Sequence, residues 1–233
     1  MKRTVYIMCA MMFAVTAISC SKQIVSQNML LPDDDGTYYM ADIAEETGLA
    51  TEADLDRPFT GIAIDKYDNG IMRRETGYRH GRRDGTDTMW FRNGQIWSRI
   101  SYKYGKLDGL SEKWYISGKQ EEARNYKDGK LDGSSATWHS NGKKKSVEYF
   151  KDGVLEGTAT KWYDNGKKES EKNYSCGVLE GKWKEWWYIN GSKKAQGCVR
   201  SGKADGVHTY WDAFGKKIAE ENYKDGEELK PNK

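Results

Sequence analysis

A unit of 24 residues recurs seven times in this chain, and this fixed period constrains the fold more than any single motif. Each unit opens on a glycine, and five of the six intervals between these glycines are 24 residues, while the sixth is 25. The opening glycines are Gly61, Gly85, Gly109, Gly133, Gly157, Gly181 and Gly206. Such a period is typical of repeat architectures, in which each unit packs only against its neighbours.

The composition agrees with a thin core shared between stacked units. With 31% charged residues among 233, the chain is too polar for a deep spherical core. Aromatic residues make up 12% of the chain and can hold a thin sheet together. Nine Trp, fifteen Tyr and only three Pro argue against a disordered chain, because their placement follows the period.

Two strand-like runs are present in each unit, and aromatic residues mark them. In five units Trp stands five residues after the opening glycine, at Trp90, Trp114, Trp138, Trp162 and Trp211. Trp187 takes this place in the longer unit if the extra residue precedes it, and the first unit has Lys66 there. The second run closes 17 residues after the glycine on Tyr78, Tyr102, Tyr126, Phe150, Tyr174 or Tyr223. Each unit therefore predicts one β-hairpin.

Asn-Gly pairs between the two runs predict the turn and the register. They occur at Asn69-Gly70, Asn93-Gly94, Asn141-Gly142, Asn165-Gly166 and Asn190-Gly191. Both residues tolerate the positive φ that a two-residue type I′ turn requires. This turn sets each closing aromatic residue opposite the opening glycine of its own unit. The Trp and the closing aromatic residue then lie on opposite faces, unless a bulge changes the parity.

The predicted fold is all-β: an elongated, twisted antiparallel β-meander of about seven tandem β-hairpin repeats. Seven hairpins supply about fourteen strands, so the sheet must twist or curl. The expected divisions are a signal peptide over residues 1–19, a lipidated cysteine and irregular tether over 20–36 and a lead-in segment over 37–60. The repeats occupy residues 61–226, and a short tail follows over 227–233.

The first twenty residues have the layout of a secretory signal. Lys2 and Arg3 precede an uncharged, mostly apolar stretch that ends at Ile18 and is too short to span a bilayer. The sequence Ala17-Ile18-Ser19-Cys20 resembles the lipobox of bacterial lipoproteins, which implies cleavage before Cys20 and acylation of its thiol. The alternative is a plain signal peptide cut nearby, with Cys20 incidental. Ser21 resembles the sorting residue of lipoproteins sent to an outer membrane, so we expect an exported, lipid-anchored envelope protein.

Nothing in the sequence indicates catalysis, and no metal or cofactor is expected. The three histidines, His80, His139 and His208, stand at unequal positions in different units, and the carboxylates recur with the repeat. Basic and acidic residues alternate, which excludes the electrostatic footprint of a nucleic-acid-binding protein. An exported location permits a disulfide between Cys176 and Cys198, and two free thiols fit the spacing equally well.

The unit W-Y-x-N-G-K-K-x(3)-E-x(2)-Y-x-D-G-x-L-x-G resembles the MORN repeat, in particular its bacterial variant in exported and YwqK-type antitoxin proteins. The turn glycines, the Trp stripe and pairs such as Asp128-Gly129 and Asp152-Gly153 carry this resemblance. It implies a non-catalytic scaffold that binds a protein, or a membrane in some eukaryotic members. The first unit departs by lacking Trp, and the unit from Gly181 departs by its length and its additional Trp183 and Trp186.

Three functions are therefore compared. The first is an envelope lipoprotein whose repeat sheet is a protein-binding scaffold. The second is an antitoxin or immunity protein that neutralises one toxin, and the third is a glycan- or lipid-binding surface module. Because Trp and Tyr dominate interface energetics, the candidate binding residues are Trp183, Trp186, Trp187, Tyr188, Trp162 and Trp138. Structural packing of Trp183 and Trp186 remains the alternative for each of them.

Overall fold

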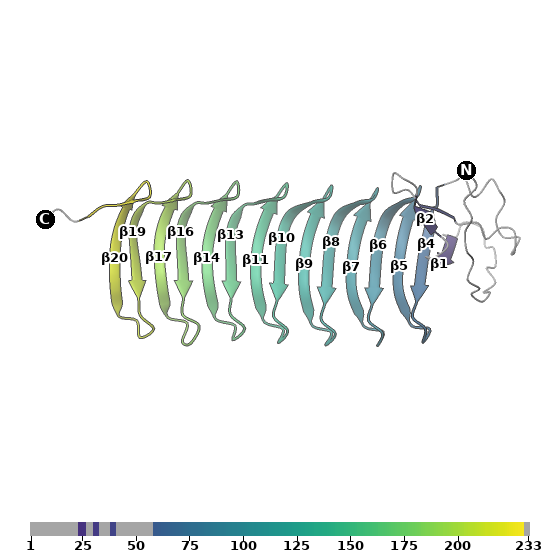
Figure 1. The fold of residues 1–233 in the computed structure, drawn as a ribbon, viewed down its shortest axis with the longest axis horizontal. Coiled ribbons are helices and arrows are strands. Elements are labelled where there is room, and N and C mark those ends of the chain that lie inside the picture. The colour runs from purple at the N-terminus through teal and green to yellow at the C-terminus, as the bar shows by residue number, and fades with distance from the viewer. Residues whose placement is uncertain (1–22, 27–29, 33–37, 41–57, 231–233) are drawn as a thin grey trace, which may run out of the picture.

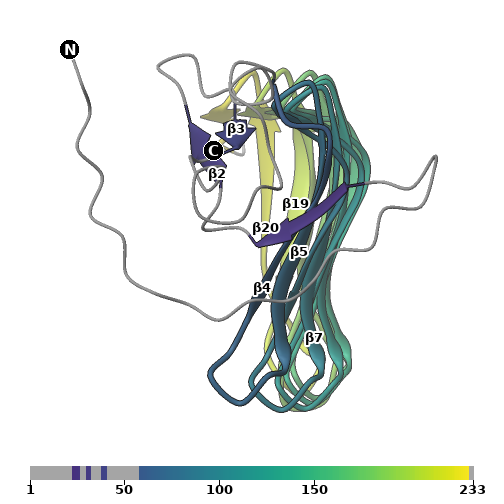
Figure 2. The same ribbon diagram turned by 90° about the vertical axis from the view of Figure 1, so that its right-hand side faces the viewer.

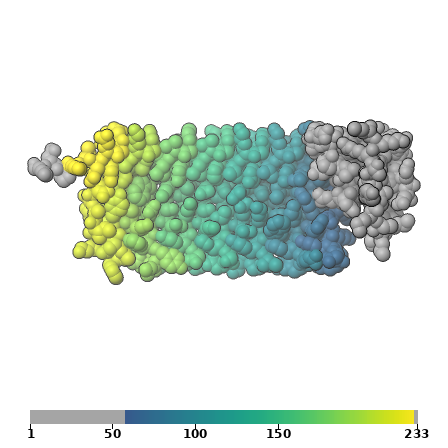
Figure 3. Space-filling view, viewed as in Figure 1, coloured from purple at the N-terminus to yellow at the C-terminus, as the bar shows by residue number. Residues whose placement is uncertain are grey.

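A computed structural model describes residues 23–26, 30–32, 38–40 and 58–230. All the secondary structure in these ranges is β, and 19 strands form one long sheet (Figure 1). The predicted all-β meander of tandem hairpins is confirmed. Figure 2 shows that the strands of successive units follow nearly the same bowed path. Figure 3 shows the units packed side by side into one continuous surface. No helix in the described ranges is long and apolar enough to cross a membrane.

Each unit contributes two strands, which alternate along the sheet in chain order. The first strands are β4 (Gly61–Lys66), β6 (Arg82–Trp90), β8 (Lys106–Trp114), β10 (Lys130–Trp138), β13 (Gly157–Trp162), β16 (Gly181–Trp186) and β19 (Gly206–Trp211). The second strands are β5 (Met72–Arg79), β7 (Ile96–Lys103), β9 (Gln120–Lys127), β11 (Lys144–Lys151), β14 (Lys168–Ser175), β17 (Lys193–Arg200) and β20 (Lys217–Lys224). Short strands link some of the units: β12 (Val154–Leu155), β15 (Val178–Leu179) and β18 (Lys203–Ala204). The short strand β21 (Glu227–Glu228) follows the last unit and pairs with β20.

The N-terminal edge of the sheet is covered by the chain itself. Strand β1 (Gln23–Ser26) pairs in parallel with β4, and β2 (Leu30–Pro32) pairs with β3 (Tyr38–Met40) in a small separate sheet. The segment expected to be an irregular tether therefore contains two strands, because backbone pairing at a sheet edge can order a segment without a strand-like pattern. The expected signal peptide and Cys20 lie outside the described residues.

The predicted register is confirmed in all seven hairpins. Each opening glycine lies opposite the closing residue of its second strand, as in Gly61 opposite Tyr78 and Gly133 opposite Phe150. In the longer unit Gly181 lies opposite Val199. Because opposed residues share a face and side chains alternate along a strand, the Trp five residues after the glycine lies on the other face.

The predicted type I′ turn at Asn-Gly is wrong, because three-residue loops join the strands of six hairpins. In the first hairpin the Gly70 amide donates to the Tyr67 carbonyl at 2.9 Å, and the Tyr67 amide donates to the Ile71 carbonyl at 2.8 Å. Gly70 has a φ of 80°, whereas Asn69 is not among the residues with positive φ. These bonds define a type I turn that ends in a glycine bulge.

A second bulge restores the register that the longer loop would shift. Lys66 lies opposite Met72 but Asp65 lies opposite Arg74, so Arg73 is an extra residue in β5. The same one-residue shift occurs beside the Trp or Lys at this position in every hairpin. The correct register therefore followed from a wrong turn type, because the loop and the bulge offset each other.

Type I′ turns are present instead at the opposite ends of the hairpins, between units. Asp128 and Gly129 have φ values of 50° and 85°, and positive φ at both central residues is what this turn requires. The corresponding pairs are His80-Gly81, Tyr104-Gly105, Asp152-Gly153, Cys176-Gly177, Ser201-Gly202 and Asp225-Gly226. The Gly129 amide also donates to the Leu107 carbonyl at 2.8 Å, which joins neighbouring turns.

Most of the buried residues lie on one face of the sheet, where they form a row. Two residues after the opening glycine, a buried side chain occurs in six of the seven units, at Ala63, Asp87, Ser111, Ser135, Ala159 and His208. Most of these side chains are small, which agrees with the thin core that the composition predicts. In the remaining unit Trp183 occupies this place and is half-buried.

Candidate binding edge

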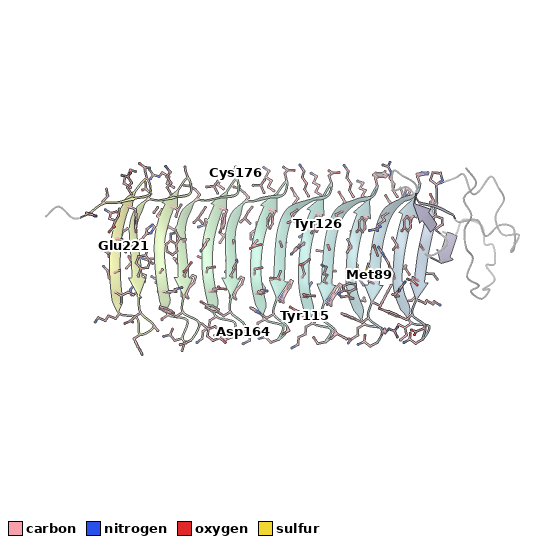
Figure 4. The ribbon with its side chains drawn as sticks, in the orientation of Figure 1. Met89, Tyr115, Tyr126, Asp164, Cys176 and Glu221 are labelled. Atoms are coloured by element: carbon pink, nitrogen blue, oxygen red, sulfur yellow. The ribbon has the colours of Figure 1, made fainter. Side chains whose placement is uncertain are left out.

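The two long edges of the molecule differ in their turns. We name the side of the three-residue loops the loop edge and the side of the type I′ turns the turn edge. Figure 4 shows Tyr115 and Asp164 at the loop edge and Cys176 at the turn edge. The same contacts recur along both edges in successive units, so a residue that breaks the pattern marks a feature of one unit alone.

A ladder of side-chain hydrogen bonds joins the units at the loop edge. In five units the residue after the Trp or Lys that ends the first strand, or after Trp186 in the longer unit, reaches the carbonyl of the Trp at the same place in the next unit. The Tyr115 hydroxyl donates to the Trp138 carbonyl at 2.8 Å, and the Tyr163 hydroxyl donates to the Trp186 carbonyl at 2.8 Å. Desolvation by burial raises the pKa of the Tyr163 hydroxyl, so this hydroxyl stays protonated to a higher pH than a free tyrosine does.

The loop asparagines and the lysines that follow them form a second ladder. The Asn165 Oδ1 accepts the Lys167 amide at 2.9 Å, and its Nδ2 donates to the Tyr188 carbonyl of the next loop at 2.8 Å. The Lys167 ammonium donates to the Ile189 carbonyl at 3.0 Å. Asn is thus explained here by its side-chain bonds rather than by positive φ.

The extra residue of the longer unit lies in its loop, between Tyr188 and Gly191. The Trp187 amide donates to the Ser192 carbonyl at 2.9 Å, so four residues rather than three form this loop. Ile189 is 79% exposed at its tip, and Tyr188 is 48% exposed. The Tyr188 hydroxyl donates to Asp164 Oδ1 at 3.0 Å, which fixes the ring beside the neighbouring loop.

The next loop carries the most exposed large hydrophobic side chain of the described residues. Phe214 is 97% exposed, and its amide donates to Asp212 Oδ1 at 2.9 Å. The two loops are joined because the side-chain Nδ2 of Asn190 and the Ser192 hydroxyl both donate to the Ala213 carbonyl. We name Tyr188, Ile189 and Phe214 the apolar tip.

Lysines flank the apolar tip along the C-terminal half of the loop edge. In the last four units, the loop segments 139–145, 163–169, 187–194 and 212–218 contain nine lysines and three acidic residues. In the first three units, the equivalent segments 67–73, 91–97 and 115–121 contain three basic and two acidic residues. The formal charge of these segments is therefore +6 in the C-terminal half and +1 in the N-terminal half.

The structure separates the sequence-predicted site residues into packing residues and one exposed residue. Trp186, and not Trp187, occupies the Trp stripe, because the extra residue follows it. The Trp187 Nε1 donates to the Trp211 carbonyl at 3.0 Å, and the Trp183 ring packs edge-on against His208 at 5.5 Å. Trp138 and Trp162 are half-buried members of the same stripe. Of the six, only Tyr188 belongs to the apolar tip.

Sequence reasoning missed Ile189 and Phe214. Both stand in loops, and the loops of the other units read Asp-Asn-Gly, Arg-Asn-Gly, Ile-Ser-Gly or Ser-Asn-Gly. The extra residue in the unit from Gly181 was the available signal, together with a large apolar side chain in a turn. Placing the extra residue before Trp187 concealed this signal.

A buried ion pair lies between the first two units, on the face of the closing aromatic residues. Asp87 is 1% exposed and accepts Arg74 Nε at 2.9 Å, and Thr76 also donates to it at 3.3 Å. This hydrogen bond to Asp87 raises the pKa of Arg74. Arg83 lies within 3.9 Å of the same carboxylate and donates to the Tyr102 hydroxyl. These contacts satisfy one buried carboxylate and join two units.

The histidines and cysteines are dispersed through the fold. His80 lies in a type I′ turn, His139 Nε2 lies 2.9 Å from the Trp162 carbonyl oxygen, and His208 is buried beside Trp183. Both cysteines of the repeat region, Cys176 and Cys198, are free thiols. Within the described ranges, no group of three or more His, Cys, Asp or Glu side chains is placed to hold a metal ion.

This geometry defines a tandem β-hairpin repeat protein, with an open sheet joined by side-chain ladders and with exposed apolar side chains in the loops of one edge. The MORN repeat variant family model matches residues 83–104, 155–175 and 204–225, which correspond to the units opening at Gly85, Gly157 and Gly206. The predicted resemblance to the MORN repeat variant is confirmed at these three units. A search of curated proteins finds no match.

Proposed function

We propose that this protein is a non-enzymatic, exported lipoprotein whose repeat sheet is a scaffold for a protein partner at the cell envelope. The observation that carries the proposal is the apolar tip, where Ile189 and Phe214 are 79% and 97% exposed. Their loops are held by hydrogen bonds from neighbouring units. Neighbouring exposed apolar side chains, as distinct from scattered single ones, are typical of interaction surfaces.

A protein partner is supported by the chemistry of the tip. Tyr and Phe supply large contact areas at low entropic cost when their positions are already fixed. Held loops also reduce the ordering cost on binding, which favours an interface over a merely mobile surface segment. The repeat array fits a scaffold because its units stack into a long surface on which residues can vary without changing the fold.

The test is chemical crosslinking in the native organism, with purification through a tag after Lys233 and mass spectrometry. We expect one protein at near-equal amounts. Recovery of no protein, with lipid or glycan retained instead, would contradict the proposal. If the recovered partner is a toxin that harms cells lacking this protein, the function would be that of an antitoxin or immunity protein.

The anchor is a separate part of the proposal and rests on the sequence around Cys20. We expect labelled palmitate to enter the intact protein and to be lost in the Cys20→Ala variant. Equal incorporation in the variant, or none in either protein, would refute the lipid anchor without affecting the binding proposal. A measured catalytic turnover that one carboxylate substitution abolishes would likewise refute the proposal that the protein is not an enzyme.

A further inference from the structure

We infer that the C-terminal half of the loop edge docks an acidic surface of a folded protein partner, with the apolar tip entering a cleft on that surface. The inference rests on the proposed function, since it names the surface and the chemistry of the partner. Three features of the loop edge carry it: the position of the lysines, the fixed geometry of the tip, and the contrast with the N-terminal half of the same edge.

The lysines leave a net positive charge around the tip. Three of the nine pair with carboxylates: Lys168 with Glu171, Lys194 with Glu185, and Lys217 with Glu220. The other six have no ion pair within the described part of the chain: Lys143, Lys144, Lys145, Lys167, Lys193 and Lys216. All six are exposed.

The nearby acidic residues are committed within the edge itself. Asp212 accepts the Phe214 and Lys216 amides, both at 2.9 Å, and Asp164 accepts the Tyr188 hydroxyl. Of the three acidic residues in the C-terminal loop segments, only Glu169 is without such a hydrogen bond among the described residues. The six lysines without an ion pair among the described residues therefore leave a positive charge around the apolar tip, and this charge is complementary to an acidic surface.

The tip itself is narrow and fixed. Its apolar side chains come from two adjacent loops whose carbonyls at Tyr188, Ile189 and Ala213 accept hydrogen bonds from Asn165, Lys167 and Asn190. A rigid projection of this kind matches a preformed cleft in a folded protein. The lysines extend over four loops on the same edge, which places the acidic residues of the partner around the cleft rather than inside it.

The N-terminal half of the loop edge serves as an internal comparison. Ile116 is 66% exposed in the loop of the unit from Gly109, at the first loop position, where Tyr188 stands in the longer loop. Its surroundings carry a formal charge of only +1, from three basic and two acidic residues. An exposed apolar loop residue thus occurs both among the lysines of the C-terminal half and, at Ile116, in the nearly neutral N-terminal half.

The first experiment is photo-crosslinking in cells, with a benzophenone-bearing phenylalanine analogue in place of Phe214. The matched control places the same analogue at Tyr104, an aromatic residue that is 58% exposed at the turn edge. We expect one protein adduct from position 214 only, and the crosslinked peptide of the partner to be rich in Asp and Glu. Adducts with lipid, or with a second copy of this chain, would overturn the inference.

The second experiment reverses charge on each edge. The variant Lys144→Glu/Lys216→Glu is expected to lower the crosslinking yield from position 214 at least tenfold. The control Lys106→Glu/Lys130→Glu alters two exposed lysines of the turn edge and is expected to leave the yield unchanged. Equal yields from the two variants would overturn the inference, provided that both melt at the wild-type temperature.

These outcomes distinguish the inference from the function on which it rests. A partner recovered through the tag that crosslinks at position 104 and not at position 214 refutes the acidic docking edge and leaves the scaffold proposal standing. No partner through the tag, together with no adduct at either position, refutes both.

Discussion

Three residues depart from the repeat at its buried position: Asp87, Trp183 and His208. The buried position lies two residues after the opening glycine, and four of the seven described units have Ala or Ser there. Asp87 is the only Asp, Glu, Lys or Arg at this position in the described units. Trp183 and His208 are the large side chains at that same position in the last two units. Each of the three is accommodated by a particular neighbour, and substitution of the residue or of that neighbour tests the packing.

The Asp87→Asn variant is expected to lower the free energy of unfolding by about 3 kcal/mol, because it leaves the partly buried Arg74 guanidinium without its counter-charge. Denaturant unfolding measures this change. The control is Asp68→Asn, whose carboxylate is 74% exposed beside Arg92 and should cost less than about 1 kcal/mol. Similar losses in the two variants would contradict the assigned role of Asp87.

Gly197 provides the space for the buried His208 ring. A Cβ on Gly197 would lie 2.5 Å from His208 Cδ2. The ring cannot move away freely, since its Nε2 lies 2.8 Å from the Cys198 carbonyl oxygen and Trp183 packs against it. We expect Gly197→Ala to destabilise the protein by about 1–3 kcal/mol.

A double-mutant cycle checks this explanation. In a His208→Ala background, Gly197→Ala should cost much less than in the wild type, because the ring that opposes the methyl group is absent. An undiminished cost in that background would show that Gly197 is required for another reason, such as its backbone conformation.

At the scale of the hairpin, the sequence predicted the strands and their register but placed the type I′ turn at the wrong end of the hairpin. Periodic Trp, Tyr and Gly were sufficient for the strands, because opposed positions recur at a fixed spacing. The turn type was not predictable from Asn-Gly alone, since Asn165 acts through two side-chain hydrogen bonds that involve its own loop and the next loop. The apolar tip was only partly predicted, because exposure of Ile189 depends on which side of Trp187 the extra residue lies.

The assignment of type I′ turns to the turn edge predicts a stabilising substitution. Cys176 has a φ of 49° at the first central position, where Asp occurs in three other turns. Asn adopts this conformation more readily than Cys, so Cys176→Asn is expected to raise the free energy of unfolding by up to about 1 kcal/mol. The neighbouring Ser175→Asn, at a strand position, should give no gain. A loss of stability in Cys176→Asn would contradict the assigned turn.

At the scale of the whole molecule, the sheet is a row of units that contact only their neighbours. Removal of residues 206–233 should therefore leave six folded units with a lower free energy of unfolding, because one set of hairpin contacts and one interface are lost. Circular dichroism and urea unfolding of the shortened protein test this. Loss of all cooperative unfolding would show that the last unit is required for the whole array.

The central claim is that the array holds the apolar tip in a fixed, exposed position, and amide hydrogen exchange tests it most directly. The amides of Gly191, Ser192 and Phe214 donate to Trp187, Asn190 and Asp212 at 2.9, 3.0 and 2.9 Å. We predict that peptides covering 187–192 and 212–216 exchange at least about tenfold more slowly in the native protein than in the urea-unfolded chain. Equal rates in the two states would show that these loops are mobile and would contradict the claim.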